Sequence, residues 1–284
     1  MLAILLALGT ALGYGVANYL APVLGRRMPL AVVLLGGQLA GLVVSLAVTA
    51  GADVTMDGPG LAFAIAAGAT NAGALACFYR AGRTGDLSVL SPITSSGAIV
   101  PVLVGLATGD RPSAVQLAGI PVVLIGIALA ARRPRMATGP GATAPASRGL
   151  GWALLAALLF GAFLTTYAEA AADSSPGALL WSRVALLSGT AVGVLVLRAP
   201  VRARPRDGAL TAVPGLLLAL GTFAFGEASR VGLLSVVSVI ATLNPVITVG
   251  LAFLLLHERP SRTQRIGAAL ALVGIGLLAA GQGP

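Results

Sequence analysis

Long apolar stretches, separated by short polar turns, dominate the chain. A helix needs roughly 20 mostly apolar residues to cross a hydrocarbon core about 30 Å thick. By that measure the pattern predicts ten membrane-spanning helices, at about 2–21, 30–50, 59–81, 87–107, 113–131, 149–171, 177–197, 208–228, 233–255 and 264–281. Turn residues such as Ser174-Ser175-Pro176 mark the breaks between them. We therefore expect an all-α integral membrane protein with ten transmembrane helices.

The apolar pattern repeats once along the chain. Residues 87–93 read LSVLSPI and residues 234–240 read LSVVSVI, and further on Asp110-Arg-Pro-Ser-x-x-Gln-x-x-Gly119 corresponds to Glu258-Arg-Pro-Ser-x-x-Gln-x-x-Gly267. The first helices match more weakly, Leu12-x-Tyr14-Gly15 against Leu158-x-Phe160-Gly161. We predict a first five-helix repeat over 1–131, a cytoplasmic linker over 132–148 and a second five-helix repeat over 149–284. Because five is odd, the two repeats enter the membrane in opposite directions, as in many transporters.

Composition and charge agree with lipid as the main solvent. The 284 residues are 57% hydrophobic and only 10% charged, whereas a soluble domain carries about 25% charged residues. The formal charge of +9 comes from 18 arginines, which in a soluble protein would suggest nucleic acid. Fifteen of them lie in or beside the loops after helices 1, 3, 5, 7 and 9. The positive-inside rule makes these loops cytoplasmic, so both termini are predicted outside a cell membrane, and no nucleic-acid partner is expected.

The duplicated motifs carry a resemblance to a known family. They are Gly85-x-Leu87-Ser88-Val89-x-Ser91-Pro92 with Asp110-Arg111-Pro112, and Gly232-x-Leu234-Ser235-Val236 with Asn244-Pro245 and Glu258-Arg259. In order and duplication the chain resembles, over essentially its whole length, the EamA-like branch of the drug/metabolite transporter superfamily. The resemblance implies export or exchange of small metabolites such as amino acids by alternating access.

Two features depart from that family's pattern. Ten-helix relatives generally have both termini in the cytoplasm, whereas the arginines here predict the reverse. The four-helix multidrug members use a glutamate in the first helix as the proton and drug site, and this first helix has no acid. The resemblance therefore does not support proton-coupled expulsion of cationic drugs.

Charged residues inside predicted helices are the sharpest candidates for a site, because charge is costly within the membrane. Arg183 could clamp a substrate carboxylate or phosphate. Alternatively it forms a structural ion pair with Glu169 or Glu227, or extends toward the outer headgroups. Glu227 and Glu169 are candidate proton-coupling residues, since burial raises a carboxyl pKa toward neutrality. Both lie near the outer boundary, where a solvated carboxylate is ordinary.

Neutral polar residues near mid-membrane are further candidates for substrate binding, with interhelical hydrogen bonding as the alternative for each. They are Gln38, Asn71, Thr94, Ser95, Thr242 and Asn244. Aromatic residues could line a cavity or anchor helices at the interface: Tyr14, Tyr167 and Trp181. Prolines in helices 4 and 9 predict kinks for gating and free carbonyls for a solute: Pro92, Pro101 and Pro245.

The main interpretation is a secondary transporter of small molecules, acting as a monomer or homodimer. One histidine, one cysteine and few acids at membrane depth argue against an enzyme, a metal site or a cofactor. A channel remains an alternative, although few acids are available to line a cation pore. A flippase for a lipid-linked polar head group is another, and a lateral opening between helices would be its structural mark.

Overall fold

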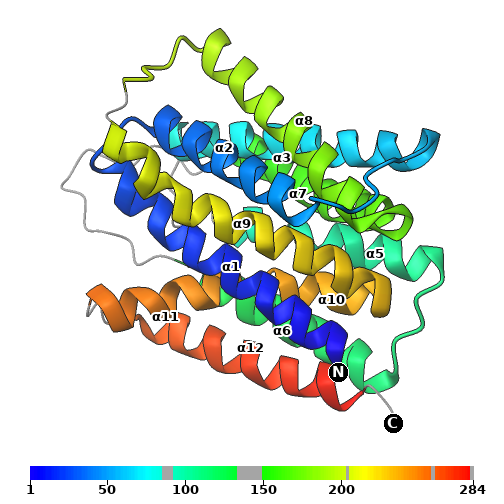
Figure 1. Cartoon of the computed structure of the whole chain (residues 1–284). Helices are drawn as coiled ribbons and strands as arrows, with labels where there is room; N and C mark the ends of the chain where they lie inside the picture. Colours follow the sequence, from blue (N-terminus) through cyan, green and yellow to red (C-terminus); the bar gives the residue numbers. More distant parts are fainter. Residues whose placement is uncertain (85–91, 133–148, 203–204, 257–259, 282–284) are drawn as a thin grey trace.

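The computed structural model describes residues 1–84, 92–132, 149–202, 205–256 and 260–281, and throughout these ranges the chain is mainly helical (Figure 1). The elements are α1 (Leu2–Gly25), α2 (Leu30–Val48), α3 (Gly58–Thr84), η1 (Ser96–Ala98), α5 (Ile99–Thr108), α6 (Ala114–Ala130), α7 (Leu150–Asp173), α8 (Ser175–Val196), α9 (Pro205–Val231), α10 (Leu234–Ala241), α11 (Asn244–Leu256) and α12 (Arg262–Ala280).

The predicted number of membrane helices is confirmed within the described residues. Eight helices are long and apolar enough to cross a membrane, one of them being α10 and α11 taken together, and two shorter apolar helices cover Pro92–Thr108 and Ala114–Ala130. Their bounds fall within a few residues of those expected, although α3 and α9 are each longer by several residues. Most of the predicted linker, 133–148, lies outside the described residues.

Side-chain size decides which face of each helix turns inward. The buried positions are rich in small residues, among them Ala7, Ala11, Ala64 and Ala67, which are fully covered. The exposed positions carry large apolar side chains, as at Leu195. Lipid tails are as apolar as leucine, so helices in a membrane gain most from close packing through small residues. Two phenylalanines and a tyrosine also pack together in this interior: Phe163, Tyr167 and Phe225.

Helices of the first half pack on helices of the second half in symmetric pairs. Helix α3 packs on α7 and α8, and its equivalent α9 packs on α1 and α2. Helix α2 contacts its own equivalent α8, and α6 contacts its equivalent α12. Each contact between the halves thus has an equivalent in which the two halves trade places. This is the pattern expected for two inverted five-helix repeats around a pseudo-two-fold axis in the membrane plane.

Two glycines at equivalent positions show how closely the halves correspond. A Cβ added at Gly161 would lie 2.5 Å from the Gly97 carbonyl oxygen, and one at Gly15 would lie 3.2 Å from the Asn244 carbonyl oxygen. Gly97 and Asn244 are themselves equivalent in the sequence repeat. Packing therefore explains why the matching first helices of the two halves share a glycine. Gly15 lies where the first helix crosses the ninth, and Gly161 lies where the sixth helix crosses the fourth.

The duplicated loop motifs begin α6 and α12 in the same way. Ser113 and Gln116 form a capping box at the start of α6, and Ser261 with Gln264 forms the same box at the start of α12. Before α6, the Asp110 carboxylate accepts a hydrogen bond of 2.7 Å from the Ser235 backbone N–H in the first turn of α10. The motif of one repeat thus caps a helix of the other.

Helices α6 and α12 meet along an antiparallel seam of glycines. A Cβ on Gly119 would lie 3.3 Å from the Gly274 carbonyl oxygen, and a Cβ on Gly126 would lie 2.8 Å from the Gly267 carbonyl oxygen. The second contact is the symmetry equivalent of the first. Neither backbone can accept a side chain without moving apart.

We expect Gly126→Ala to destabilise the protein by about 1–3 kcal/mol, the usual cost of overpacking. The new Cβ would lie 2.5 Å from the Ala271 backbone nitrogen. Gly276→Ala in α12 is the matched control, since a Cβ there meets nothing within 4 Å. Thermal unfolding in detergent measures both variants, and equal melting temperatures for the two would contradict a tight seam.

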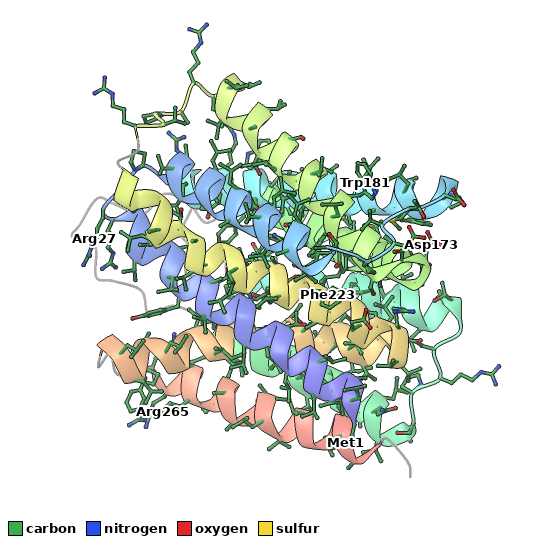
Figure 2. All side chains as sticks on the ribbon, in the orientation of Figure 1. Met1, Arg27, Asp173, Trp181, Phe223 and Arg265 are labelled. Atoms are coloured by element: carbon green, nitrogen blue, oxygen red, sulfur yellow. The ribbon has the colours of Figure 1, made fainter. Side chains whose placement is uncertain are left out.

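Described residues from the arginine-rich segments lie at one end of the bundle. In Figure 2, Arg27 and Arg265 lie at one end of the helices, and Met1 and Asp173 lie at the other. The structure thus separates the two classes of loop, and which end faces the cytoplasm stays a prediction of the arginine distribution.

That orientation is testable by thiol labelling in intact cells. Cys77 is the only cysteine of the chain and is buried, so Cys77→Ala gives a cysteine-free background. In it, a membrane-impermeant thiol reagent should label Ala52→Cys, in the exposed turn after α2, without permeabilisation. Pro200→Cys, exposed after α8, should react only in permeabilised cells. The opposite labelling pattern would place the arginine-rich end outside.

Candidate functional site

One membrane helix of each half is interrupted along its length. In the second half α10 ends at Ala241 and α11 begins at Asn244, with Pro245 in its first turn. In the first half the short 3-10 turn η1 precedes α5, and Pro101 follows Gly97 by four residues. Proline has no N–H, so the carbonyls of Ala241 and Gly97 lack their usual helical donors. Helix breaks thus lie near Pro101 and Pro245, and their part in gating stays a prediction.

A buried polar cluster lies at a similar depth, where α2, α8 and α9 meet. Arg183 is 4% exposed and donates from Nη2 to the Thr222 hydroxyl at 2.6 Å and to the Leu218 carbonyl at 2.5 Å. Its Nη1 donates to Gln38 Oε1 at 3.4 Å. Arg183 and Gln38 each stand eight residues inside their helices, roughly 12 Å from the nearer end at 1.5 Å per residue. The guanidinium is therefore placed deep in the bundle.

Tyr14 joins this cluster to a helix interruption. Its hydroxyl lies 2.9 Å from the Thr222 hydroxyl. The next residue, Gly15, packs against the start of α11, and its carbonyl accepts a hydrogen bond of 3.1 Å from the Thr248 hydroxyl. One turn of α1 therefore contacts both the Arg183 cluster and the interrupted helix.

The charge of Arg183 has no acidic partner among the described residues. The ion pair found there joins Arg230 to Glu227 at 3.5 Å, and Glu227 stays partly exposed. Glu169, near the end of α7, is exposed. In the described part of the chain Arg183 does not form the predicted alternative ion pairs with these two glutamates. Its hydrogen-bond partners there are instead neutral oxygen atoms.

Tyr167 approaches the same face of α9 one turn further along. Its ring lies 6.3 Å from the Phe225 ring, and its hydroxyl would lie 3.6 Å from a Cβ on Gly226. The side chain is fully buried, and its hydroxyl has no hydrogen-bond partner among the described residues. Such an unpaired buried hydroxyl costs free energy unless a ligand or water forms a hydrogen bond with it.

The other predicted site residues lie apart from this cluster. Asn71 is half-buried on α3, Thr94 and Ser95 lie beside η1, and Thr242 and Asn244 flank the gap between α10 and α11. Pro92 lies at the start of the described part of the fourth helix. Trp181 is exposed on α8 and donates from its ring nitrogen to the Val54 carbonyl in a loop, as an interface anchor would.

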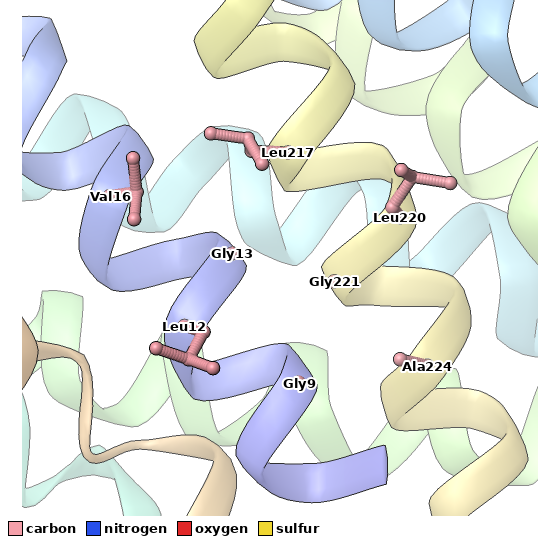
Figure 3. A pocket seen from close by; sticks show the side chains of 8 residues that line it. All are labelled: Gly9, Leu12, Gly13, Val16, Leu217, Leu220, Gly221 and Ala224. Atoms are coloured by element: carbon pink, nitrogen blue, oxygen red, sulfur yellow. The ribbon is translucent and has the colours of Figure 1, made fainter.

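An apolar groove opens between α1 and α9. It has a volume of about 340 Å³, and Figure 3 shows its wall of leucines, valine and small residues. Those residues are Gly9, Leu12, Gly13, Val16, Leu217, Leu220, Gly221 and Ala224. Gly221 also touches the ring of Tyr14, because a Cβ there would lie 3.1 Å from that ring. Tyr14 thus contacts both a residue of the groove wall and the polar cluster.

Comparison with known proteins matches the second half of the chain to a family model. Residues 147–280 match the model of the EamA-like transporter family. This segment is EamA-like. The match confirms the resemblance carried by the sequence motifs. A crystal structure 15% identical to this chain aligns with 99% of it and 97% of its own length, at a TM-score of 0.82, which shows a shared fold. Comparison with curated proteins finds no match.

The EamA-like segment supplies most of the cluster but not all of it. Arg183, Thr222 and Tyr167 lie within residues 147–280, whereas Tyr14 and Gln38 come from the first half. Sequence patterns singled out four of these five residues and missed Thr222. Among the described residues no group of three histidine, cysteine, aspartate or glutamate side chains could hold a metal ion.

We expect Thr222→Val to lower stability by about 1–3 kcal/mol, because it removes the hydroxyl that accepts from Arg183 and meets Tyr14. Thr190→Val is the control, since the Thr190 hydroxyl bonds to the Leu186 carbonyl of its own helix. Thermal unfolding in detergent measures the difference. Equal losses in the two variants would mean that the cluster bond adds nothing beyond a helical threonine.

Proposed function

We propose that this EamA-like protein is a secondary transporter, an exporter or exchanger, that moves small organic metabolites across the cell membrane by alternating access. The observation that carries the proposal is the pair of equivalent helix interruptions, accompanied by a buried polar cluster at similar depth. Transporters with inverted repeats bind substrate near the midplane, at the interface of the repeats and beside discontinuous helices. No catalytic step or cofactor forms part of the proposal.

The contacts between repeats supply a route for the motion. Alternating access moves one repeat or bundle against the other around a fixed site. Here α1 touches Thr222 through Tyr14 and α11 through Gly15. A shift of α11 against α1 would therefore alter the surroundings of the cluster. The cluster draws on both halves, as a site between moving parts must.

A second candidate function is movement of a lipid-linked polar head group. The groove between α1 and α9 favours it, because its apolar wall could hold an acyl chain while the adjacent cluster accepts a polar group. The two functions differ in what crosses the membrane. A flippase moves a molecule whose tail stays in the bilayer.

Reconstituted proteoliposomes distinguish these functions. We expect saturable uptake of at least one labelled solute from a panel of amino acids, organic acids, sugars, nucleosides and cationic drugs. Uptake should accelerate when vesicles are preloaded with the same unlabelled solute, because an exchanger returns loaded faster than empty. Empty liposomes are the control.

Other outcomes would redirect the assignment. Flux that rises linearly with the gradient and shows no exchange would indicate a channel. Movement of a fluorescent phospholipid analogue between leaflets, without uptake of any soluble solute, would support the flippase and contradict the main proposal.

A further inference from the structure

Arg183 holds hydrogen-bond donors that the described residues leave unused. A guanidinium has five N–H groups, and in the described part of the chain Arg183 makes three hydrogen bonds. All three go to uncharged oxygens, and one acceptor, the Leu218 carbonyl, is shared with the Thr222 hydroxyl at 2.7 Å. A buried cation held only by neutral acceptors is costly in a membrane protein. The site therefore favours an added anion.

Tyr167 provides a second unused donor beside it. Arg183 meets α9 at positions 218 and 222, and Tyr167 meets the same helix at Gly226, four residues on. Residues four apart share a helix face and lie about 6 Å from each other. Both donors therefore line one strip of α9.

Glycines pack closely against both groups. A Cβ on Gly41 would lie 3.5 Å from Arg183 Nη1, and a Cβ on Gly226 would lie 3.1 Å from the Tyr167 ring. Larger residues at these positions would crowd the guanidinium and the phenol. The packing symmetry relates Arg183 to Gln38, because Gly68 meets Ala185 of α8 as its equivalent Gly215 meets Ala40 of α2. The symmetric position therefore contributes no second cation.

We propose that Arg183 and Tyr167 bind a single carboxylate group of the transported solute. The inference rests on the proposed transport function and names its substrate class. A carboxylate is a stronger acceptor than a carbonyl or hydroxyl and matches the guanidinium fork. On binding it accepts hydrogen bonds from the Arg183 donors that the described residues leave unused and from the Tyr167 hydroxyl. One cation matches one negative charge, which selects a monocarboxylate over a phosphate.

Thermal shift on the detergent-purified protein tests this directly. The probes are acetate, lactate, leucine and phenylalanine, each paired with its amide, which lacks the carboxylate, together with inorganic phosphate and phosphatidic acid. A ligand that binds only the folded protein raises its melting temperature. We expect at least one carboxylate to stabilise the wild type and its amide to have no effect. In Arg183→Gln its affinity should fall at least about tenfold, and in Arg183→Lys by less.

Tyr167→Phe separates recognition from structure. It removes an unpaired buried hydroxyl, so the empty variant should melt at the wild-type temperature or higher. Its affinity for the carboxylate should nevertheless fall about threefold to tenfold. Tyr79→Phe, on α3 beside Phe78, is the control and should bind like the wild type. This variant keeps the test available if Arg183→Gln does not fold.

Several results would overturn the carboxylate site. They are no stabilisation by any carboxylate, equal stabilisation in Arg183→Gln, or stabilisation by phosphate or phosphatidic acid alone. The transport assay separates this inference from the proposed function. Uptake of a neutral solute at the wild-type rate in Arg183→Gln would support the transport function and contradict the carboxylate site. Carboxylate binding without uptake or exchange would support the carboxylate site and contradict the transport function.

Discussion

The hydrocarbon core of a bilayer offers no hydrogen bonds, so every helix break and every buried charge must find its partners within the protein. That constraint explains the position of the polar features. The break before α5 is covered by α7, where Gly161 lies on the Gly97 carbonyl, and the break before α11 is covered by α1 at Gly15. Arg183 lies where three helices meet and draws on a side chain, a hydroxyl and a carbonyl.

The same constraint ties the two halves together. Neither half could cover its own interrupted helix, because the covering glycines come from the first helix of the opposite half. Each capping motif likewise begins a helix that packs on its equivalent, and Asp110 reaches across to α10. The structure at mid-membrane therefore depends on both repeats being present.

The number and bounds of the helices could be predicted because bilayer thickness fixes the length of an apolar run. Arg183 and Gln38 stood out as strongly polar side chains within such runs. Thr222 did not, because threonine often bonds its own helix, and only the rotation of α9 brings its hydroxyl to Arg183. The rotation of α8 likewise turns Trp181 outward, away from the cluster. Helices that are apolar on every face carry no periodic signal that shows which side turns inward.

The glycine seam between α6 and α12 is self-complementary, since its two contacts exchange under the pseudo-two-fold axis. Such a surface does not depend on whether its two helices belong to one polypeptide. A shorter protein containing a single five-helix unit could form the same seam with a second copy, provided that the copies inserted in opposite orientations. Joining two units in one chain removes that need for dual insertion. It also frees each half to diverge, so that one can hold an arginine where the other keeps a glutamine.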